Sequence, residues 1–265
     1  MSDSGNPTGM HDEFAAAAAT MPEPFRLWLH ESCGSTNDEA RALGETGAAA
    51  GAVIVANHQS AGRGRRGASW IGQPGDSLMF SILWRTAAAK PLWPRLALAT
   101  GLAVAEACEA SVPLVGIKWP NDVWIEGKKV AGILVEAGHD FVVAGVGINV
   151  NTREFPEAIQ ASATSLGIAS GRRLDRAHLL ADVLKRFARH AGKLDAGFEE
   201  VIAAVRKRCV LTGNLVELRL QTGEPLRGHC ENISPSGELL VRNGGKLMRI
   251  LQAEDVRPAP DPSVE

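Results

Sequence analysis

The sequence contains no tyrosine, and aromatic residues make up only 5% of its 265 residues. A nucleic-acid-binding surface that stacks bases on aromatic rings therefore has few side chains available. The four cysteines are far apart and form no CxxC pair, which favours reduced thiols over a disulfide framework or a zinc site. The formal net charge is only -2, so no overall basic field attracts nucleic acid or an anionic membrane.

Long apolar runs and targeting signals are also lacking. The most apolar stretch, around 96–107, contains Glu106 and follows Arg95, so it is too short and too charged to span a bilayer. No Lys or Arg precedes Arg26, which argues against a secretory signal peptide. We therefore expect a cytoplasmic protein without membrane contact, and a hydrophobic content of 45% is enough for a packed core.

Apolar patterning and turn residues predict an α+β fold with a mixed, largely antiparallel sheet. We expect a flexible tail over 1–24, a main domain over 25–209 and a small β domain over 210–260. Short connections between 115 and 150 favour antiparallel hairpins. The stretch 35–47 predicts a helix with capping-box spacing at Thr36 and Glu39, and Gly44 or Gly47 can end it. The other expected elements are strands at 25–31, 52–59 and 77–84, a helix at 93–110 and two helices between 174 and 209.

Residues 62–70 read "GRGRRGASW" and directly follow a predicted strand. Backbone N–H groups of such a loop can converge on an anion, and arginine adds bidentate donors that suit phosphate. The stretch lacks the Lys-Ser/Thr pair of a Walker A loop and the spacing of a dinucleotide fingerprint. It predicts either a phosphate cradle or a basic arm for nucleic acid, and the pattern alone leaves both open.

Residues 118–136 read "KWPNDVWIEGKKVAGILVE". Pro120 favours a turn that presents Asn121 and Asp122 at a strand end. Lys129 leads into an apolar strand, so its stem can be partly buried, and a partly buried lysine beside an acid can stabilise developing negative charge. Lys128 is expected to point to the opposite face. The plainer alternative is an ordinary turn followed by a solvated hairpin tip.

Together with "STN" at 35–37 and "GVGINVN" at 145–151, these stretches resemble the biotin–protein ligases in their order and separations. The resemblance runs from about Leu27 to the C-terminus. It implies a class II synthetase-like catalytic domain over 25–209 and a C-terminal SH3-like β-barrel over 210–260. Only about 24 residues precede the first predicted strand, so we expect no N-terminal DNA-binding domain and no DNA partner.

The resemblance also implies the reaction. Biotin and ATP would form biotinyl-5′-AMP with Mg²⁺ present, and biotin would then pass to a lysine of a biotin carboxyl carrier protein, as in a biotin–[acetyl-CoA-carboxylase] ligase. The enzyme would be a monomer or a weak homodimer. A lipoate or octanoate ligase on the same scaffold, or a non-enzymatic nucleic-acid-binding regulatory protein, are the alternatives.

The resemblance assigns roles residue by residue. The catalytic residues would be Lys129, Asp122 and Arg63, with Asp122 also a possible Mg²⁺ ligand and no certain metal site. The residues expected to contact biotin are Ser35, Thr36, Asn37, Gln59, Arg63, Gly64, Arg65, Lys129, Gly132 and Leu134. The residues expected to contact ATP or the adenylate are Gly62, Arg63, Gly64, Arg65, Arg66, Gly67, Trp70, Asn121, Lys129 and Asn149.

Overall fold

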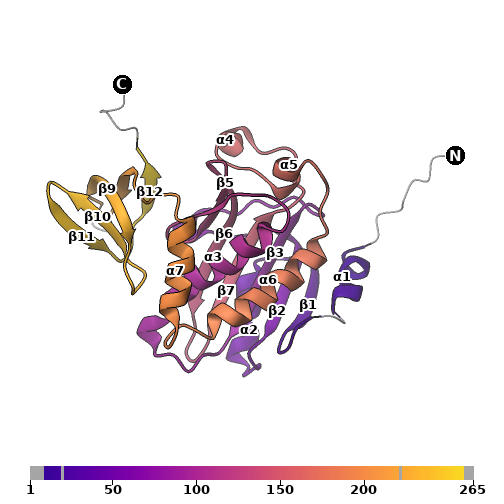
Figure 1. Cartoon of the computed structure of the whole chain (residues 1–265). Coiled ribbons are helices and arrows are strands. Elements are labelled where there is room, and N and C mark those ends of the chain that lie inside the picture. The colour runs from indigo at the N-terminus through magenta and orange to yellow at the C-terminus, as the bar shows by residue number, and fades with distance from the viewer. Residues whose placement is uncertain (1–8, 19–20, 221–222, 260–265) are drawn as a thin grey trace.

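The structure, a computed structural model, describes residues 9–18, 21–220 and 223–259. Its centre is a seven-stranded sheet with the order β1-β2-β3-β7-β6-β5-β4 (Figure 1). Only β1 and β2 pair in parallel, because helix α2 carries the chain back between them; the other neighbouring pairs are antiparallel. The strands are β1 (Arg26–Cys33), β2 (Ala52–Gln59), β3 (Ser77–Trp84), β4 (Val115–Lys118), β5 (Asp122–Ile125), β6 (Lys128–Ala137) and β7 (Val142–Asn149). The expected mixed, largely antiparallel sheet is confirmed.

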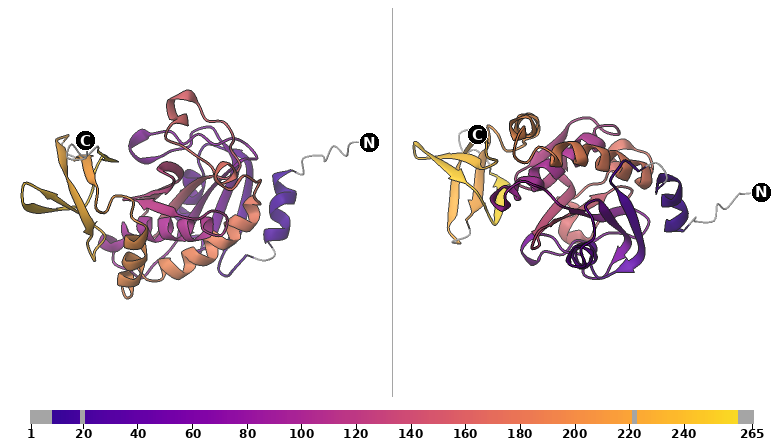
Figure 2. Two further views of the ribbon diagram at one scale, coloured as in Figure 1. Left: turned by 45° about the horizontal axis from the view of Figure 1, so that its top comes forward. Right: turned by 90° about the horizontal axis from the view of Figure 1, so that it is seen from below.

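Helices cover both faces of this sheet (Figures 1 and 2). On one face lie α3 (Arg95–Cys108), α6 (Arg176–Ala191) and α7 (Phe198–Arg208), and on the other lies α2 (Thr36–Glu45). Helix α3 is buried on nearly all sides, at 11 of its 14 residues, because it lies between the sheet and the other two helices. The shorter helices are η1 (Arg65–Gly67), η2 (Lys90–Leu92), α4 (Glu157–Gln160) and α5 (Leu166–Ser170).

The alternation of strand β3 explains the two faces. Leu78, Phe80 and Ile82 point into the large core beneath α3 and α6, whereas Leu83 packs with Ala40 of α2. Successive strand residues point to opposite faces, so Ser77, Met79 and Ser81 lie on the α2 side. The α2 side is the face that carries the candidate site.

A second sheet follows α7 and contains five antiparallel strands in the order β11-β10-β9-β8-β12, which is consistent with the expected small barrel. It contacts the rest of the chain through polar bonds as well as a shared apolar core. Trp119 donates to the carbonyl of Gly237 at 2.9 Å, and Arg206 donates to the carbonyl of Ile233 at 2.7 Å. Its strands are β8 (Leu215–Arg219), β9 (Pro225–Ile233), β10 (Leu239–Asn243), β11 (Lys246–Ile250) and β12 (Asp255–Pro258).

The expected flexible tail over 1–24 contains an ordered helix, α1 (Met10–Ala18). Phe14 is fully buried and Met10 is nearly so, and the helix packs against β1 and α6 at the end of the molecule opposite the C-terminal sheet (Figures 1 and 2). The expectation is therefore wrong for 10–18. The helix forms because the segment is rich in alanine, and because its two large apolar residues are spaced i, i+4 and so lie on one face. Residues 1–8 and 19–20 of the expected tail lie outside the described residues.

Within the described part of the chain, no helix has the length and apolar character needed to cross a membrane.

Candidate functional site

A row of glycines forms the floor of the candidate site. In the sheet, Gly147 of β7 pairs with Gly132 of β6, and Gly145 pairs with both Leu134 of β6 and Ser81 of β3. Directly paired residues share a face, so the three glycines leave space on this face for side chains from other segments. A Cβ atom on Gly145 would lie 2.1 Å from Asn37 Oδ1, and one on Gly147 would lie 2.3 Å from the indole of Trp70. Only glycine permits these close approaches.

Hydroxyl and amide groups gather where α2 begins. Ser35, Thr36 and Asn37 are buried at 3–4% exposure. The backbone N–H and the hydroxyl of Thr36 both donate to Gln59 Oε1, at 2.8 and 3.1 Å. Gln59 therefore turns its amide nitrogen away from Thr36, so that its donors are available to a ligand.

The expected capping box at Thr36 and Glu39 does not form. Helix α2 begins at Thr36, its N-cap is Ser35, and no side chain caps it. The Thr36 hydroxyl donates to Gln59 instead. The side chain that was expected to cap the helix therefore belongs to the site.

Ser81 and Glu136 orient the Asn37 amide. Ser81 is fully buried, and its hydroxyl lies 2.6 Å from Asn37 Oδ1 and 2.7 Å from Thr36 Oγ1. Asn37 Nδ2 donates to Glu136 Oε2 at 2.5 Å. A donor on one side and an acceptor on the other fix which way the amide points. Sequence reasoning missed both residues, although a serine within the apolar strand "SLMFSILW" is a signal that could have found Ser81.

The arginine loop, residues 62–70, closes on itself. Gly64 N–H donates to the carbonyl of Ala68 at 2.6 Å, and Trp70 N–H donates to the carbonyl of Gly62 at 2.9 Å. Arg66 sits in the left-handed region at φ 59°. This compact turn fixes where each arginine side chain begins.

Each arginine of the loop has a partner. Arg63 donates to both carboxylate oxygens of Asp38 at 2.6 Å, and this hydrogen bonding holds the pKa of Asp38 below its usual value. Arg66 pairs with Glu254 at 3.4 Å. Arg65 donates to Asn121 Oδ1 at 3.2 Å and to the Ala253 carbonyl at 3.3 Å. The loop is thereby connected to the segment that precedes β12.

Lys129 reaches the site because strand β6 contains a bulge. Asp122 pairs with Gly132, but the register shifts beyond Val123, and Trp124 pairs with Lys129. The extra residue brings Lys129 to the same face as Asp122 and Gly132, which is how bulges re-aim side chains. Lys128 is the next residue along the strand and pairs with the buried Ile125. Its own side chain is exposed.

Lys129 and Asp122 form the ion pair of the site. Lys129 Nζ lies 2.8 Å from Asp122 Oδ1 and 5.7 Å from the centre of the Trp70 ring. The pair is close but not aligned as a hydrogen bond, so the buried Asp122 Oδ1 has no hydrogen-bond donor. Lys118 lies nearby, and burial lowers its pKa. Lys118 Nζ also lies 3.9 Å from Asp255 Oδ1, so two ammonium groups and two carboxylates lie close together here.

One pocket brings most of the expected residues together. All ten residues expected to contact biotin line it, and so do Trp70 and Asn121. Gly62, Arg66, Gly67, Asp122 and Asn149 do not line it. Asn149 is buried, and its Nδ2 donates to the carbonyl of Thr164 at 3.1 Å. The pocket also has lining residues that were not assigned from the sequence: Ile133, Gly145, Val146 and Gly147.

A second cavity of about 630 Å³ adjoins this pocket and shares Arg65, Asn121, Ile133 and Leu134 with it. It lies between the start of α3, strand β6 and the turn around Gly237 of the C-terminal sheet. The polar pocket thus opens toward a larger, mostly apolar groove between the two sheets.

Comparison with known proteins identifies the family of this chain. The profile of the Biotin/lipoate A/B protein ligase family matches residues 31–152. The chain is 34% identical over 232 residues to the Biotin--[acetyl-CoA-carboxylase] ligase of Mycobacterium tuberculosis, covering 84% of this chain and 85% of that one. The chain belongs to the biotin–protein ligase family.

Two further members of the family extend the comparison. The Bifunctional ligase/repressor BirA of Bacillus subtilis is 32% identical over 237 residues, which cover 86% of this chain and 73% of BirA. The structure of the biotin protein ligase from Aquifex aeolicus in complex with biotin and ATP matches with a TM-score of 0.80 at 33% identity, covering 88% of this chain and 99% of the Aquifex chain. This structural match confirms the expected fold class for this member of the biotin–protein ligases.

Proposed function

We propose that this biotin–protein ligase attaches biotin to a lysine of a biotin carboxyl carrier protein through biotinyl-5′-AMP. The observation that carries the proposal is the division of the pocket into two ends. One end holds hydroxyl and amide groups around Gln59, and the other holds Lys129 and Arg65 beside Trp70. The neutral end suits a ureido group, which both donates and accepts hydrogen bonds. The cationic end suits a carboxylate and a phosphate.

In the first step, a carboxylate oxygen of biotin attacks the α-phosphorus of ATP, and pyrophosphate leaves. No side chain has to act as a nucleophile, so the residues contribute position and charge stabilisation. Lys129 would stabilise the charge that develops between the carboxylate and the α-phosphate, with Arg63 and Arg65 along the biotin chain and the phosphates. Trp70 would stack on adenine, and Asn149 would flank it.

In the second step, the amine of the carrier lysine attacks the acyl carbon, AMP leaves, and the amine gives up a proton. Asp122 is the proposed acceptor of that proton, because it is the carboxylate nearest to Lys129 at 2.8 Å.

Mg²⁺ would enter with ATP as part of the substrate. The described residues contain no group of three His, Cys, Asp or Glu side chains placed to hold a metal ion. Asp122 already faces an ammonium group, so phosphate oxygens and water would supply most of the ligands, as Mg²⁺ prefers.

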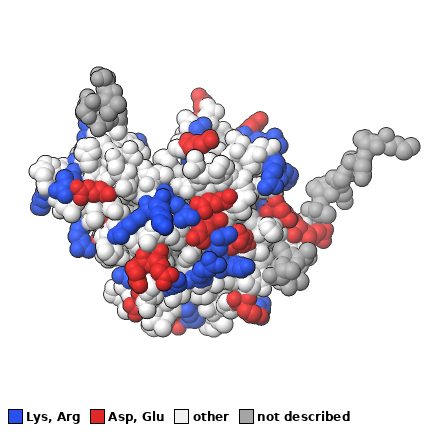
Figure 3. All heavy atoms as spheres, in the orientation of Figure 1, with Lys and Arg blue, Asp and Glu red and all other residues white. Residues whose placement is uncertain are grey.

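We further propose 25–209 as the catalytic domain and 210–260 as a domain that supports the ATP or carrier side of the site. The contacts of Arg65 and Arg66 with 253–254 support this division. We also propose that the protein is cytoplasmic, that it is a monomer or a weak homodimer, and that it has no DNA partner. On the face drawn in Figure 3, acidic and basic side chains are interspersed rather than gathered into a basic surface.

The test is pyrophosphate release by the purified chain with MgATP and biotin, without any carrier. We expect biotin-dependent release, followed by transfer of label to a carrier domain when one is added. Release that depends on lipoate or octanoate and not on biotin would instead favour the related lipoate ligases, which share the family profile.

A further inference from the structure

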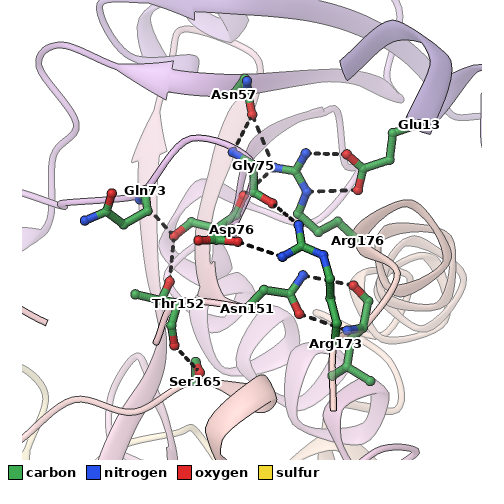
Figure 4. A network of polar contacts seen from close by, with 12 residues as sticks. Glu13, Asn57, Gln73, Gly75, Asp76, Asn151, Thr152, Ser165, Arg173 and Arg176 are labelled. Carbon is green, nitrogen blue, oxygen red and sulfur yellow. Dashed lines mark hydrogen bonds and ion pairs between the residues drawn. The ribbon is translucent and has the colours of Figure 1, made fainter. Parts of the chain in front are cut away.

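Arg176, the first residue of α6, is a buried cation outside the pocket. Only 4% of its surface is exposed, and it lies at the centre of a polar network (Figure 4). Its Nε donates to Glu13 Oε1 of helix α1 at 2.9 Å, and its Nη2 donates to the other oxygen of the same carboxylate. Its guanidinium also lies 5.7 Å from the centre of the Phe14 ring. A buried cation is tolerated only with such a counter-ion.

The other side of Arg176 holds the turn that follows the arginine loop. Arg176 Nη1 donates to the Ser77 carbonyl at 3.0 Å and to Asn57 Oδ1 at 3.3 Å. The same Asn57 oxygen accepts from the N–H of Gly75 at 2.8 Å. Turn 73–77 is therefore anchored at two points (Figure 4). The Arg176 guanidinium holds Ser77 directly, and it holds Gly75 through the Asn57 side chain. Trp70 lies three residues before this turn.

Turn 73–77 is also linked to the strands behind the site. The Ser77 hydroxyl lies 3.3 Å from the Thr152 hydroxyl, and Ser165 Oγ donates to the Thr152 carbonyl at 2.6 Å (Figure 4). The neighbouring Thr164 donates its N–H to the carbonyl of Lys129 at 2.9 Å.

The network therefore joins the backbone segments that carry three residues proposed to handle ATP: Trp70, Lys129 and Asn149. Asn149 completes the connection, since its side chain bonds the carbonyl of Thr164. The residues proposed to hold the biotin head are oriented separately, by Ser81 and Glu136.

We propose that Arg176 is a positioning residue for the nucleotide half of the site, and that helix α1 holds it in place through Glu13. The assignment of that half to ATP rests on the proposed function. Loss of the Glu13 charge leaves the guanidinium buried without its counter-ion, so it shifts toward water and releases Ser77 and Asn57. Turn 73–77 then loosens, while the contacts around Gln59 and Asn37 stay as they are.

The experiment uses the full-length chain with Glu13→Gln, which removes the charge and keeps the shape. We expect the KM for ATP to rise by about tenfold, the effect of losing one charge-assisted contact. The KM for biotin, and biotin binding measured without ATP, should stay unchanged. Asp12→Asn is the matched control, since Asp12 lies one residue away on the exposed side of the same helix. Arg176→Lys keeps the cation but loses the forked geometry, so it should show the same split.

Amide hydrogen exchange gives a readout that does not depend on activity. Exchange across 73–77 should be faster in Glu13→Gln than in the unaltered chain, with no change at 35–37. A lower melting temperature with unchanged KM for ATP and unchanged exchange at 73–77 would reduce α1 to a purely structural role and overturn the proposal. So would an equal rise in both KM values. If the unaltered chain releases no pyrophosphate with biotin, the proposed function fails, and the exchange result still decides whether α1 holds this turn.

Discussion

Replacing Lys129 with alanine is the most direct test of the proposed chemistry. Lys129 Nζ is held 2.8 Å from Asp122 and above the Trp70 ring, at 35% side-chain exposure. It is the ammonium group that lines the pocket beside the glycine floor. Because Asp122 and the Trp70 ring hold the ammonium group in place, its charge needs little reorganisation during the reaction, and this makes such a group effective.

The magnitude follows from this pre-organisation. Loss of one preorganised donor aimed at developing negative charge costs roughly 10²- to 10³-fold in rate, or about 2.7–4 kcal/mol. The alanine variant should still fold, because Asp122 is mostly buried but retains Lys118 as a nearby cation. The loss should therefore appear in adenylate formation and only weakly in the free energy of unfolding.

Pyrophosphate release under single-turnover conditions measures this step, and Lys128→Ala is the matched control. Lys128 is exposed and pairs with Ile125, away from the pocket, so its removal should change the rate by less than about twofold, as for an ordinary surface residue. Equal losses in the two variants, or a normal rate for Lys129→Ala, would refute the assignment of the charge to Lys129.

Two further predictions concern the floor and the loop. Gly147→Ala places a methyl group 2.3 Å from the Trp70 indole, so it should raise the KM for ATP. Gly101→Ala, whose Cβ would lie 3.8 Å from its nearest neighbour, should leave that KM unchanged, and a similar KM in both variants would count against stacking of adenine on the indole. Asp38→Asn removes the carboxylate that holds Arg63, so amide exchange across 62–69 should accelerate; adenylate formation should then restore protection, and unchanged protection would argue for a static loop.

The sequence predicted the elements of the fold well, because buried strands and amphipathic helices differ clearly in period. Strands 52–59 and 77–84 were predicted with their observed ends. Prediction from the sequence failed for helix α1, because its alanine run has no polar–apolar alternation. The helix is fixed by the burial of Phe14 and by the pairing of Glu13 with an arginine 163 residues away, a partner that no local pattern contains.

The candidate site was predictable in its residue types but not in its orientation. Strict alternation on β6 from Gly132 would place Val130 and Lys128 on the site face and Lys129 on the opposite one. The bulge reverses this, and no residue between 128 and 132 marks it, apart from a glycine that already serves the floor. The resemblance to known ligases therefore selected the lysine that lines the pocket, whereas periodicity alone would have chosen Lys128.

The arginine loop also differs physically from what its sequence suggests. Three arginines among three glycines indicate mutual repulsion until an anion arrives. In the structure, Asp38 neutralises Arg63, Glu254 neutralises Arg66, and Arg65 donates to two neutral oxygens. An incoming phosphate would meet Arg65 most readily, because no carboxylate has to be displaced from it and its two present bonds, at 3.2 and 3.3 Å, are long. Arg63 could turn to the ligand only by leaving Asp38. Ligand binding by Arg63 would therefore be coupled to a change in the loop. Arg65, in contrast, can bind phosphate with the loop as it stands.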